Sequence, residues 1–143
     1  MRYEQGVADL RRGQKFETRR QLSHMVGGTP FRGISYRTGA AHVAVVSGSP
    51  SPNRFNYRDR WLDKEKQEFQ YYGQWYGCQD MTMTGGNAAI EDRSPHLYLF
   101  IHDGDGYVFE GRFRYVSRRT ELTVHPDCAN QQFKAIVFRL ARI

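Results

Sequence analysis

The segment from Tyr107 to Tyr115 constrains the fold more than any other part of the chain. Aromatic residues recur along it with a period of two, and charged residues occupy the positions between them. This alternation predicts a strand with one buried face and one polar face. Gly111 lies on the aromatic face, where it favours a bulge or a close backbone contact. The aromatic positions are Tyr107, Phe109, Phe113 and Tyr115, and the charged positions are Glu110, Arg112 and Arg114.

The rest of the chain predicts more strands and a few short helices. Thr18 and Gln21 fit a capping box for a helix over residues 19–26, which Gly27 ends. A second short helix is expected over residues 87–90, and residues 29–39 form a loop with several cations. Residues 103–106 read DGDG and favour a hairpin turn, although Asp103 and Asp105 are also cation ligands by type. Strands are expected at residues 41–46, 69–72, 97–101, 107–115 and 133–140.

The composition favours one α+β domain with a polyanionic partner. A chain of 143 residues is expected to form a single domain over 1–143, with residues 1–12 as a loose N-terminal extension. Many strands with few helices predict a twisted or barrel-like sheet. Lys and Arg total 21 against 15 Asp and Glu, a net charge of +6, which favours nucleic acid.

The two cysteines, Cys78 and Cys128, do not form a C-x-x-C pair. This spacing indicates neither a metal site nor a disulfide framework, and no cofactor is expected. A structural or free thiol is expected at Cys128. The N-terminus lacks an apolar signal core and no apolar run spans a bilayer. A reducing cytoplasm, in contact with the nucleoid, is therefore the expected location.

Residues 56–61 and 69–77 form the densest cluster of functional residue types. They alternate aromatic residues with cations, a carboxylate and glycines. Aromatic rings sandwich a flipped base, and a carboxylate accepts a hydrogen bond from an exocyclic amine such as cytosine N4. From these residue types alone, a surface loop over an aromatic core remains an alternative.

The order of several short motifs resembles a known family. The chain is similar to the SRA (SET- and RING-associated)-like domain fused to HNH nucleases in bacterial McrA-type modification-dependent restriction enzymes. The resemblance covers nearly the whole chain after residue 13. The motifs are Tyr57-x-Asp59-x-Trp61, Phe69-x-Tyr71-x-Gly73, Gly77, Asp80-Met81 and Gly86-Asn87-x-Ala89-Ile90.

This resemblance implies an SRA/PUA-like fold, a curved, partly open β-barrel with a few short flanking helices. It also implies a reader that flips 5-methylcytosine or a related modified cytosine out of double-stranded DNA. Tyr57 and Tyr71 are then expected to stack on the flipped base while Asp59 reads its N4. Trp61 is expected to replace or widen one wall of the base pocket, and Gly73 lets the backbone approach the base.

Two departures from the family pattern concern the duplex. The family's Gly-Glu-Gly is Gly73-Gln74-Trp75 here, and the loop after Gly77 lacks the long finger of eukaryotic SRA domains. Gln74, Trp75 or Tyr76 is therefore expected to fill the gap that the flipped base leaves in the duplex. The remaining expected contacts to the duplex and its phosphates are Ser47, Gly48, Arg32, Arg37, Asn87, Arg112, Arg114 and Arg118.

Other residues of the chain do not form the motifs of an enzyme. The five histidines do not have the spacing of an HNH site, and no acid or oxyanion loop accompanies His125 and Cys128. Residues 85–87 lack the Lys-Ser/Thr of a P-loop, although a helix start there is able to bind a phosphate. We expect no catalysis and a nuclease encoded separately. A base-flipping nuclease or glycosylase and an RNA-binding relative remain the alternatives.

Overall fold

The structure is a computed structural model that describes residues 3–30, 32–48, 59–75, 77–124 and 126–143. The helices are α1 (Tyr3–Ala8), α2 (Arg19–Val26) and α3 (Gly85–Asp92), with a 3-10 turn, η1, at Pro126–Cys128. The strands are β1 (Lys15–Phe16), β2 (Ile34–Ser35), β3 (Val43–Ser47), β4 (Arg60–Trp61), β5 (Glu68–Tyr72), β6 (Leu97–His102), β7 (Tyr107–Val124) and β8 (Gln132–Arg142).

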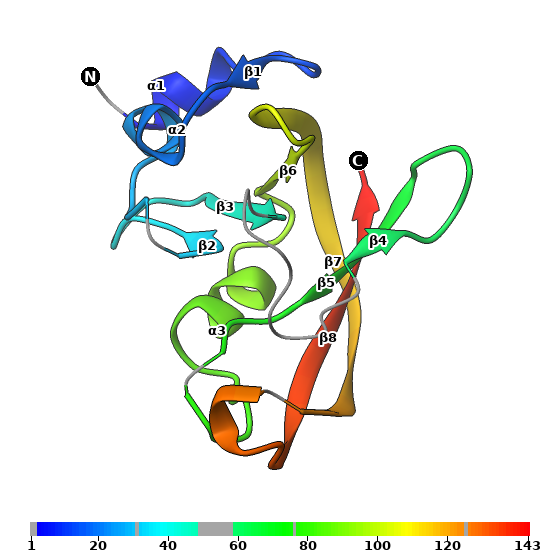
Figure 1. Cartoon of the computed structure of the whole chain (residues 1–143). Coiled ribbons are helices and arrows are strands. Elements are labelled where there is room, and N and C mark those ends of the chain that lie inside the picture. Colours follow the sequence, from blue (N-terminus) through cyan, green and yellow to red (C-terminus); the bar gives the residue numbers. More distant parts are fainter. Residues whose placement is uncertain (1–2, 31, 49–58, 76, 125) are drawn as a thin grey trace.

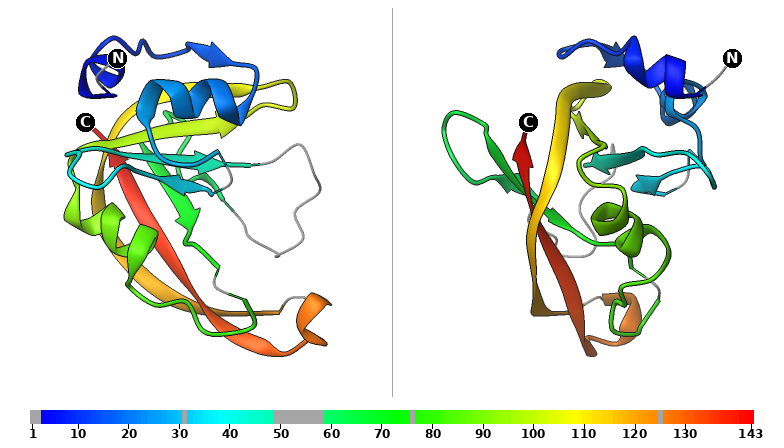
Figure 2. Two further views of the ribbon diagram at one scale, coloured as in Figure 1. Left: turned by 90° about the vertical axis from the view of Figure 1, so that its left-hand side faces the viewer. Right: turned by 180° about the vertical axis from the view of Figure 1, so that it is seen from behind.

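The strands form one strongly curved sheet (Figures 1 and 2). Its order is β2-β3-β6-β7-β8-β5-β4, and β1 pairs with β7 outside this order. Strands β3 and β6 run parallel, whereas the other pairs are antiparallel. Strands β2 and β4 lie at opposite ends of the order, so the barrel stays open between them. The predicted curved, partly open barrel is confirmed.

Strand β7 shows how the sequence produces this curvature. Phe109 and Phe113 are both buried, but on opposite sides of the sheet, since Phe109 packs with α1 and α2 and Phe113 packs in the barrel interior. The single aromatic face predicted for residues 107–115 was therefore wrong. Between the two rings, Gly111 has a φ of 116°. Leu99 pairs with Gly111 but Phe100 pairs with Phe109, so an extra residue bulges from β7 at this point. A second bulge follows Tyr115. Bulges bend and twist a strand, which lets β7 continue as one strand to Val124, well beyond its predicted end.

Helix α2 begins and ends where its capping residues predict. The Thr18 side chain accepts a hydrogen bond from the Gln21 backbone N–H, and the Gly27 N–H donates to the Ser23 carbonyl. Leu22 and Val26 are fully buried. They pack on the outer side of the sheet together with α1, whose Val7 is 7% exposed. Part of the segment 1–12 that the sequence marks as an extension therefore forms a helix that packs on α2.

Two hydrophobic clusters hold the barrel together. The first fills its interior and includes Ala89 and Ile90 of α3, which covers the inner side of the sheet (Figure 1). The second lies between the sheet and α1 and α2. Among the described residues, no helix combines the length and the apolar character needed to cross a bilayer.

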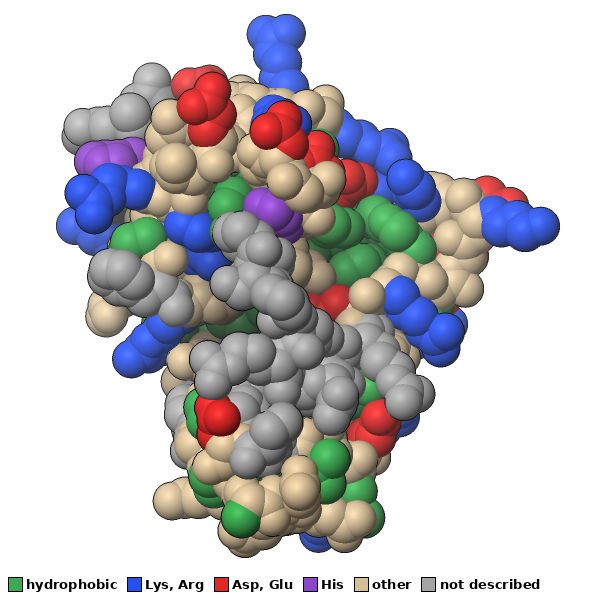
Figure 3. Space-filling model, viewed as in Figure 1, with side chains coloured by type: hydrophobic (Ala, Val, Ile, Leu, Met, Phe, Trp, Pro, Cys, Tyr) green, Lys and Arg blue, Asp and Glu red, His purple; other side chains and the backbone are tan. Residues whose placement is uncertain are grey.

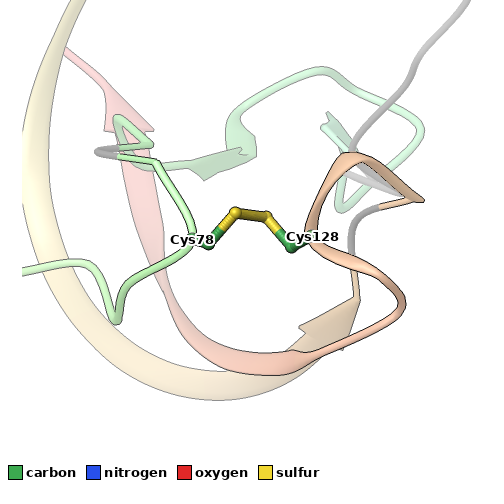
Figure 4. The surroundings of a disulfide bond; sticks show 2 residues. All are labelled: Cys78 and Cys128. Atoms are coloured by element: carbon green, nitrogen blue, oxygen red, sulfur yellow. A yellow bond between two sulfur atoms is a disulfide. The ribbon is translucent and has the colours of Figure 1, made fainter.

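A disulfide joins Cys78 to Cys128, with their Cα atoms 5.6 Å apart (Figure 4). The expectation that the cysteines form no disulfide was wrong. They are separated by 50 residues in the sequence, so no spacing motif reveals the pair. They meet because η1 follows the long β7 strand and returns beside the segment after β5. Disulfides are uncommon in a reducing cytoplasm, which was the expected location.

Candidate nucleic-acid interface

The ends of β3 and β5 meet at Asp59, which immediately precedes β4. Ser47 Oγ donates a hydrogen bond to Asp59 Oδ2 at 2.8 Å, and the Tyr72 backbone N–H donates to Asp59 Oδ1 at 2.8 Å. We call this region the β3–β5 junction and define it by Val46, Ser47, Asp59, Tyr71 and Tyr72. Residues far apart in the sequence thus converge on one carboxylate.

Burial of the Asp59 carboxylate changes its acidity. Loss of solvation raises the pKa of Asp59 from its ordinary value of 3.8 to about 6. The hydrogen bonds from Tyr72 and Ser47 act in the opposite direction, because they stabilise the ionised form. At neutral pH the group is a carboxylate with two oxygen acceptors inside the protein, which is the chemistry needed to read an amino group on a base.

Tyr71 reaches the same junction from β5. It is 4% exposed, and its hydroxyl donates to the Val46 carbonyl at 3.1 Å. Gly33 lies against this hydroxyl, since a Cβ at position 33 would come within 2.7 Å of Tyr71 Oη. The structure therefore brings together the predicted residues Asp59, Tyr71 and Ser47. The predicted pocket residue Tyr57 lies outside the described residues.

Trp61 occupies a different part of the barrel interior. Its ring packs edge-on against Phe69, with centroids 5.0 Å apart, and lies 6.0 Å from the ring of Phe113. The guanidinium of Arg142 covers it, with Cζ 5.6 Å from the ring centroid. These contacts place Trp61 in the packing of the β4–β5 hairpin.

Gly73 and Gln74 are held by the buried side chain of Asn87. Asn87 Oδ1 accepts from the Gln74 N–H at 2.7 Å, and its Nδ2 donates to the carbonyls of Gln74 and Thr82. A Cβ at Gly73 would lie 2.7 Å from the same Asn87 oxygen. Since Asn87 is 0% exposed and its backbone N–H donates to Thr84, it has no group available for a phosphate. We therefore reassign Asn87 from a DNA contact to a residue that positions the loop.

The predicted insertion segment after β5 points partly inward. The Gln74 side chain packs against Gly86, where a Cβ would lie 2.4 Å from Gln74 Oε1. Trp75 is partly buried against the interior cluster, and Tyr76 lies outside the described residues. At the other end of the junction Gly48, with a φ of 87°, lies against His102.

The predicted phosphate-binding cations fall on separate surfaces. Arg32 and Arg37 are exposed and flank β2, next to the junction. Arg112 and Arg114 are exposed on the face of β7 opposite Phe113, outside the barrel. Arg118 pairs with Glu91. A groove of about 480 Å³ opens on the outer face of β5, β8 and β7, and Arg118 is the predicted site residue that lines it.

The view in Figure 3 shows an exposed hydrophobic patch between β6 and the β4–β5 hairpin. Lys and Arg side chains border the patch. An apolar surface bordered by cations suits a ligand with flat bases and a charged backbone. Among the described residues, no group of three His, Cys, Asp or Glu side chains is arranged to hold a metal ion.

Comparison with protein families matches residues 12–143 to the family described as "ScoMcrA-like, SRA domain". This chain is an SRA domain of that family. The predicted resemblance is thereby confirmed. A search of curated proteins returned no match.

Solved structures of other SRA domains share the fold. The structure titled "Sulfur binding domain and SRA domain of ScoMcrA complexed with phosphorothioated DNA" matches with a TM-score of 0.72 and 19% identity, over 94% of this chain and 40% of that one. The SRA domain of SUVH5 with methylated CHH DNA matches with a TM-score of 0.70 and 21% identity, over 94% and 90%. The modification-dependent TagI restriction endonuclease matches with a TM-score of 0.65 and 22% identity, over 94% and 50%. The chain thus spans less than half of the ScoMcrA protein in the first of these structures.

Sequence reasoning missed one charged residue close to this interface. Arg19, at the start of α2, donates through Nη2 to the carbonyl of Arg32, directly before Gly33. Its place in the 3.6-residue pattern of α2 gives no sign of this role, because the contact is with the backbone of Arg32, 13 residues further along the chain.

Proposed function

We propose that this SRA domain binds double-stranded DNA and reads a modified cytosine by flipping it into the β3–β5 junction. The observation that carries the proposal is the convergence of Asp59, Ser47 and Tyr71 within this fold. Asp59 supplies an acceptor for N4, and Tyr71, whose hydroxyl bonds the residue before Ser47, supplies the aromatic ring for stacking.

The free-energy cost of flipping a base must be offset by contacts in the pocket. Flipping a base costs a few kcal/mol of stacking and pairing, which the pocket must return through Tyr71 and Asp59. A 5-methyl group adds about 1 kcal/mol when it is buried in an apolar niche. In the free protein each oxygen of Asp59 accepts one hydrogen bond, from Ser47 or Tyr72, and a carboxylate oxygen can accept a second bond from a base amine. The net preference for a modified base is therefore modest, and phosphate contacts supply most of the affinity.

The SUVH5 structures contain methylated or hydroxymethylated DNA, and the ScoMcrA structure contains phosphorothioated DNA. These partners support modified DNA as the ligand class. The decisive experiment titrates the domain with duplexes that differ only at one cytosine, carrying no modification, 5-methyl or 5-hydroxymethyl. A phosphorothioate duplex is a further arm. Preference for a modified cytosine supports the proposal, and equal affinity for all duplexes contradicts it.

We also infer that the domain binds without cutting DNA. It matches only part of two restriction endonucleases, 26% of ScoMcrA and 50% of TagI, which favours a nuclease located elsewhere. Labelled modified duplex should stay intact with magnesium, manganese or zinc, and should gain no abasic sites. Cleavage that survives purification and disappears with Asp59→Ala would establish the alternative, a base-flipping enzyme. A parallel titration with RNA tests the RNA-binding alternative.

A further inference from the structure

Arg19 is a partly buried cation next to an exposed one. It is the first residue of α2, and its guanidinium lies over the ring of Tyr107, with Cζ 5.7 Å from the centroid. Its Nη2 donates to the Arg32 carbonyl, whereas the neighbouring Arg20 side chain is exposed. The two arginines therefore differ in burial although they are adjacent in the sequence.

The Arg32 carbonyl that Arg19 holds leads directly to the β3–β5 junction. The next residue, Gly33, accepts a hydrogen bond from the Val46 N–H at 2.7 Å and lies against the Tyr71 hydroxyl. That hydroxyl donates to the Val46 carbonyl at 3.1 Å. Arg19 thus fixes one end of a short segment, residues 32–33, whose other contacts are with Val46 and Tyr71.

The hydrogen bond from Arg19 to the Arg32 carbonyl requires partial desolvation of the Arg19 guanidinium. Burial lowers the pKa of Arg19, and Tyr107 and Tyr71 partly oppose that change. Its Nε is buried and has no hydrogen-bond partner among the described residues. An apolar side chain at this position would avoid the desolvation of a charged group, whereas Arg19 also supplies the donor that bonds the Arg32 carbonyl.

We infer that Arg19 is a positioning residue of the base pocket, which holds residues 32–33 against Tyr71 so that the tyrosine ring keeps the orientation that receives a flipped base. This inference rests on the proposed function. Arg19 acts through the Arg32 carbonyl and Gly33, and it does not itself contact the base. Removing it should loosen the orientation of Tyr71 and leave the outer surface of the domain intact.

The test compares Arg19→Met, Arg19→Lys and the matched control Arg20→Met. Affinity is measured for a duplex with 5-methylcytosine and for the same duplex without it, and 2-aminopurine next to the target cytosine reports flipping. Arg19→Met should lower the preference for the modified duplex by about fivefold or more and reduce the flipping signal, with affinity for unmodified DNA changed by less than about twofold. Arg19→Lys should restore part of the preference, because an ammonium still donates to the Arg32 carbonyl. Arg20→Met should leave the ratio of the two affinities unchanged.

Gly33→Ala provides a second route to the same segment, because its Cβ would clash with the Tyr71 hydroxyl. It should lower the same preference, and its effect should not add to that of Arg19→Met. Thermal melts identify variants that have lost the fold; if Arg19→Met is unfolded, Arg19→Lys and Gly33→Ala decide. Folded variants that keep the full preference overturn the role of Arg19 while the proposed function stands. A wild-type domain without any preference overturns the proposed function, and the role of Arg19 with it.

Discussion

Ser47 Oγ donates a hydrogen bond to Asp59 Oδ2 at 2.8 Å, which joins the end of β3 to the residue before β4. Ser47 is 4% exposed and Asp59 is half-buried, so the bond is partly shielded from solvent. The bond fixes the orientation of the Asp59 carboxylate and leaves Oδ2 able to accept a second hydrogen bond.

Replacing Asp59 should remove specificity and leave general DNA binding intact. Asp59→Ala removes the N4 acceptor, and we expect a loss of about 1–3 kcal/mol for the modified site. Affinity for unmodified duplex should barely change because the phosphate contacts remain. Paired titrations of the two duplexes, with thermal melts as a folding control, measure the effect. A folded Asp59→Ala protein with full preference for modified cytosine would place the pocket elsewhere.

The raised pKa of Asp59 predicts how stability depends on pH. The folded protein binds this proton more tightly than the unfolded chain, because burial raises the pKa from 3.8 to about 6. The stabilisation is therefore complete below about pH 4 and is lost as the pH rises through about 6, a change on the order of 3 kcal/mol. Asp59→Asn does not titrate, so its free energy of unfolding relative to wild type should increase between pH 4 and pH 7. Urea unfolding at four pH values checks this, and parallel curves for the two proteins would contradict it.

Breaking the disulfide should lower stability. Cys78→Ser is expected to reduce the free energy of unfolding by about 2–4 kcal/mol, since the bond closes a long loop in the unfolded chain. Cys128→Ser and the double variant should lose the same amount, because each change removes the same bond. Urea unfolding with and without reductant measures this. Reductant should destabilise the wild type to the level of the variants and have no further effect on them.

Asn87 should be important for stability although it was expected to contact DNA. Asn87→Ala leaves the Gln74 N–H and two carbonyls without their partner, and we expect a loss of about 2–4 kcal/mol. Asp92→Ala, an exposed change on the same helix, should be close to neutral. Urea unfolding of both variants compares them. A stable Asn87→Ala protein with weakened DNA binding would restore the original interpretation.

A substitution of Arg114 tests whether the exposed cations of β7 contact DNA phosphates. If the exposed face of β7 contacts phosphates, Arg114→Ala should weaken binding to modified and unmodified duplex equally and reduce the slope of log affinity against log salt by about 1. An unchanged salt slope would show that the duplex lies on the Arg32 and Arg37 side of the barrel instead. Titrations at four salt concentrations distinguish the two surfaces.

Local patterns in the sequence were sufficient for the elements that depend on near neighbours. The alternation over residues 107–115 predicted β7, and Thr18 with Gln21 predicted the start of α2. The motif around Asp59 and Tyr71 located the candidate site because it resembles the SRA family, whereas residue types alone left a surface loop as an alternative.

The sequence by itself determined the periodicity of the strands, the helix cap, the basic charge and the motifs of the SRA family, since these depend on residue type and on spacings of a few positions. The tertiary structure decided which distant residues meet. The Asp59–Ser47 bond, the Cys78–Cys128 disulfide and the contact of Arg19 with the Arg32 carbonyl join segments 12 to 50 residues apart. Such pairs are set by the curvature of the whole sheet, to which the two bulges in β7 contribute. No local pattern encodes them, because the same residues would not meet on a flat sheet.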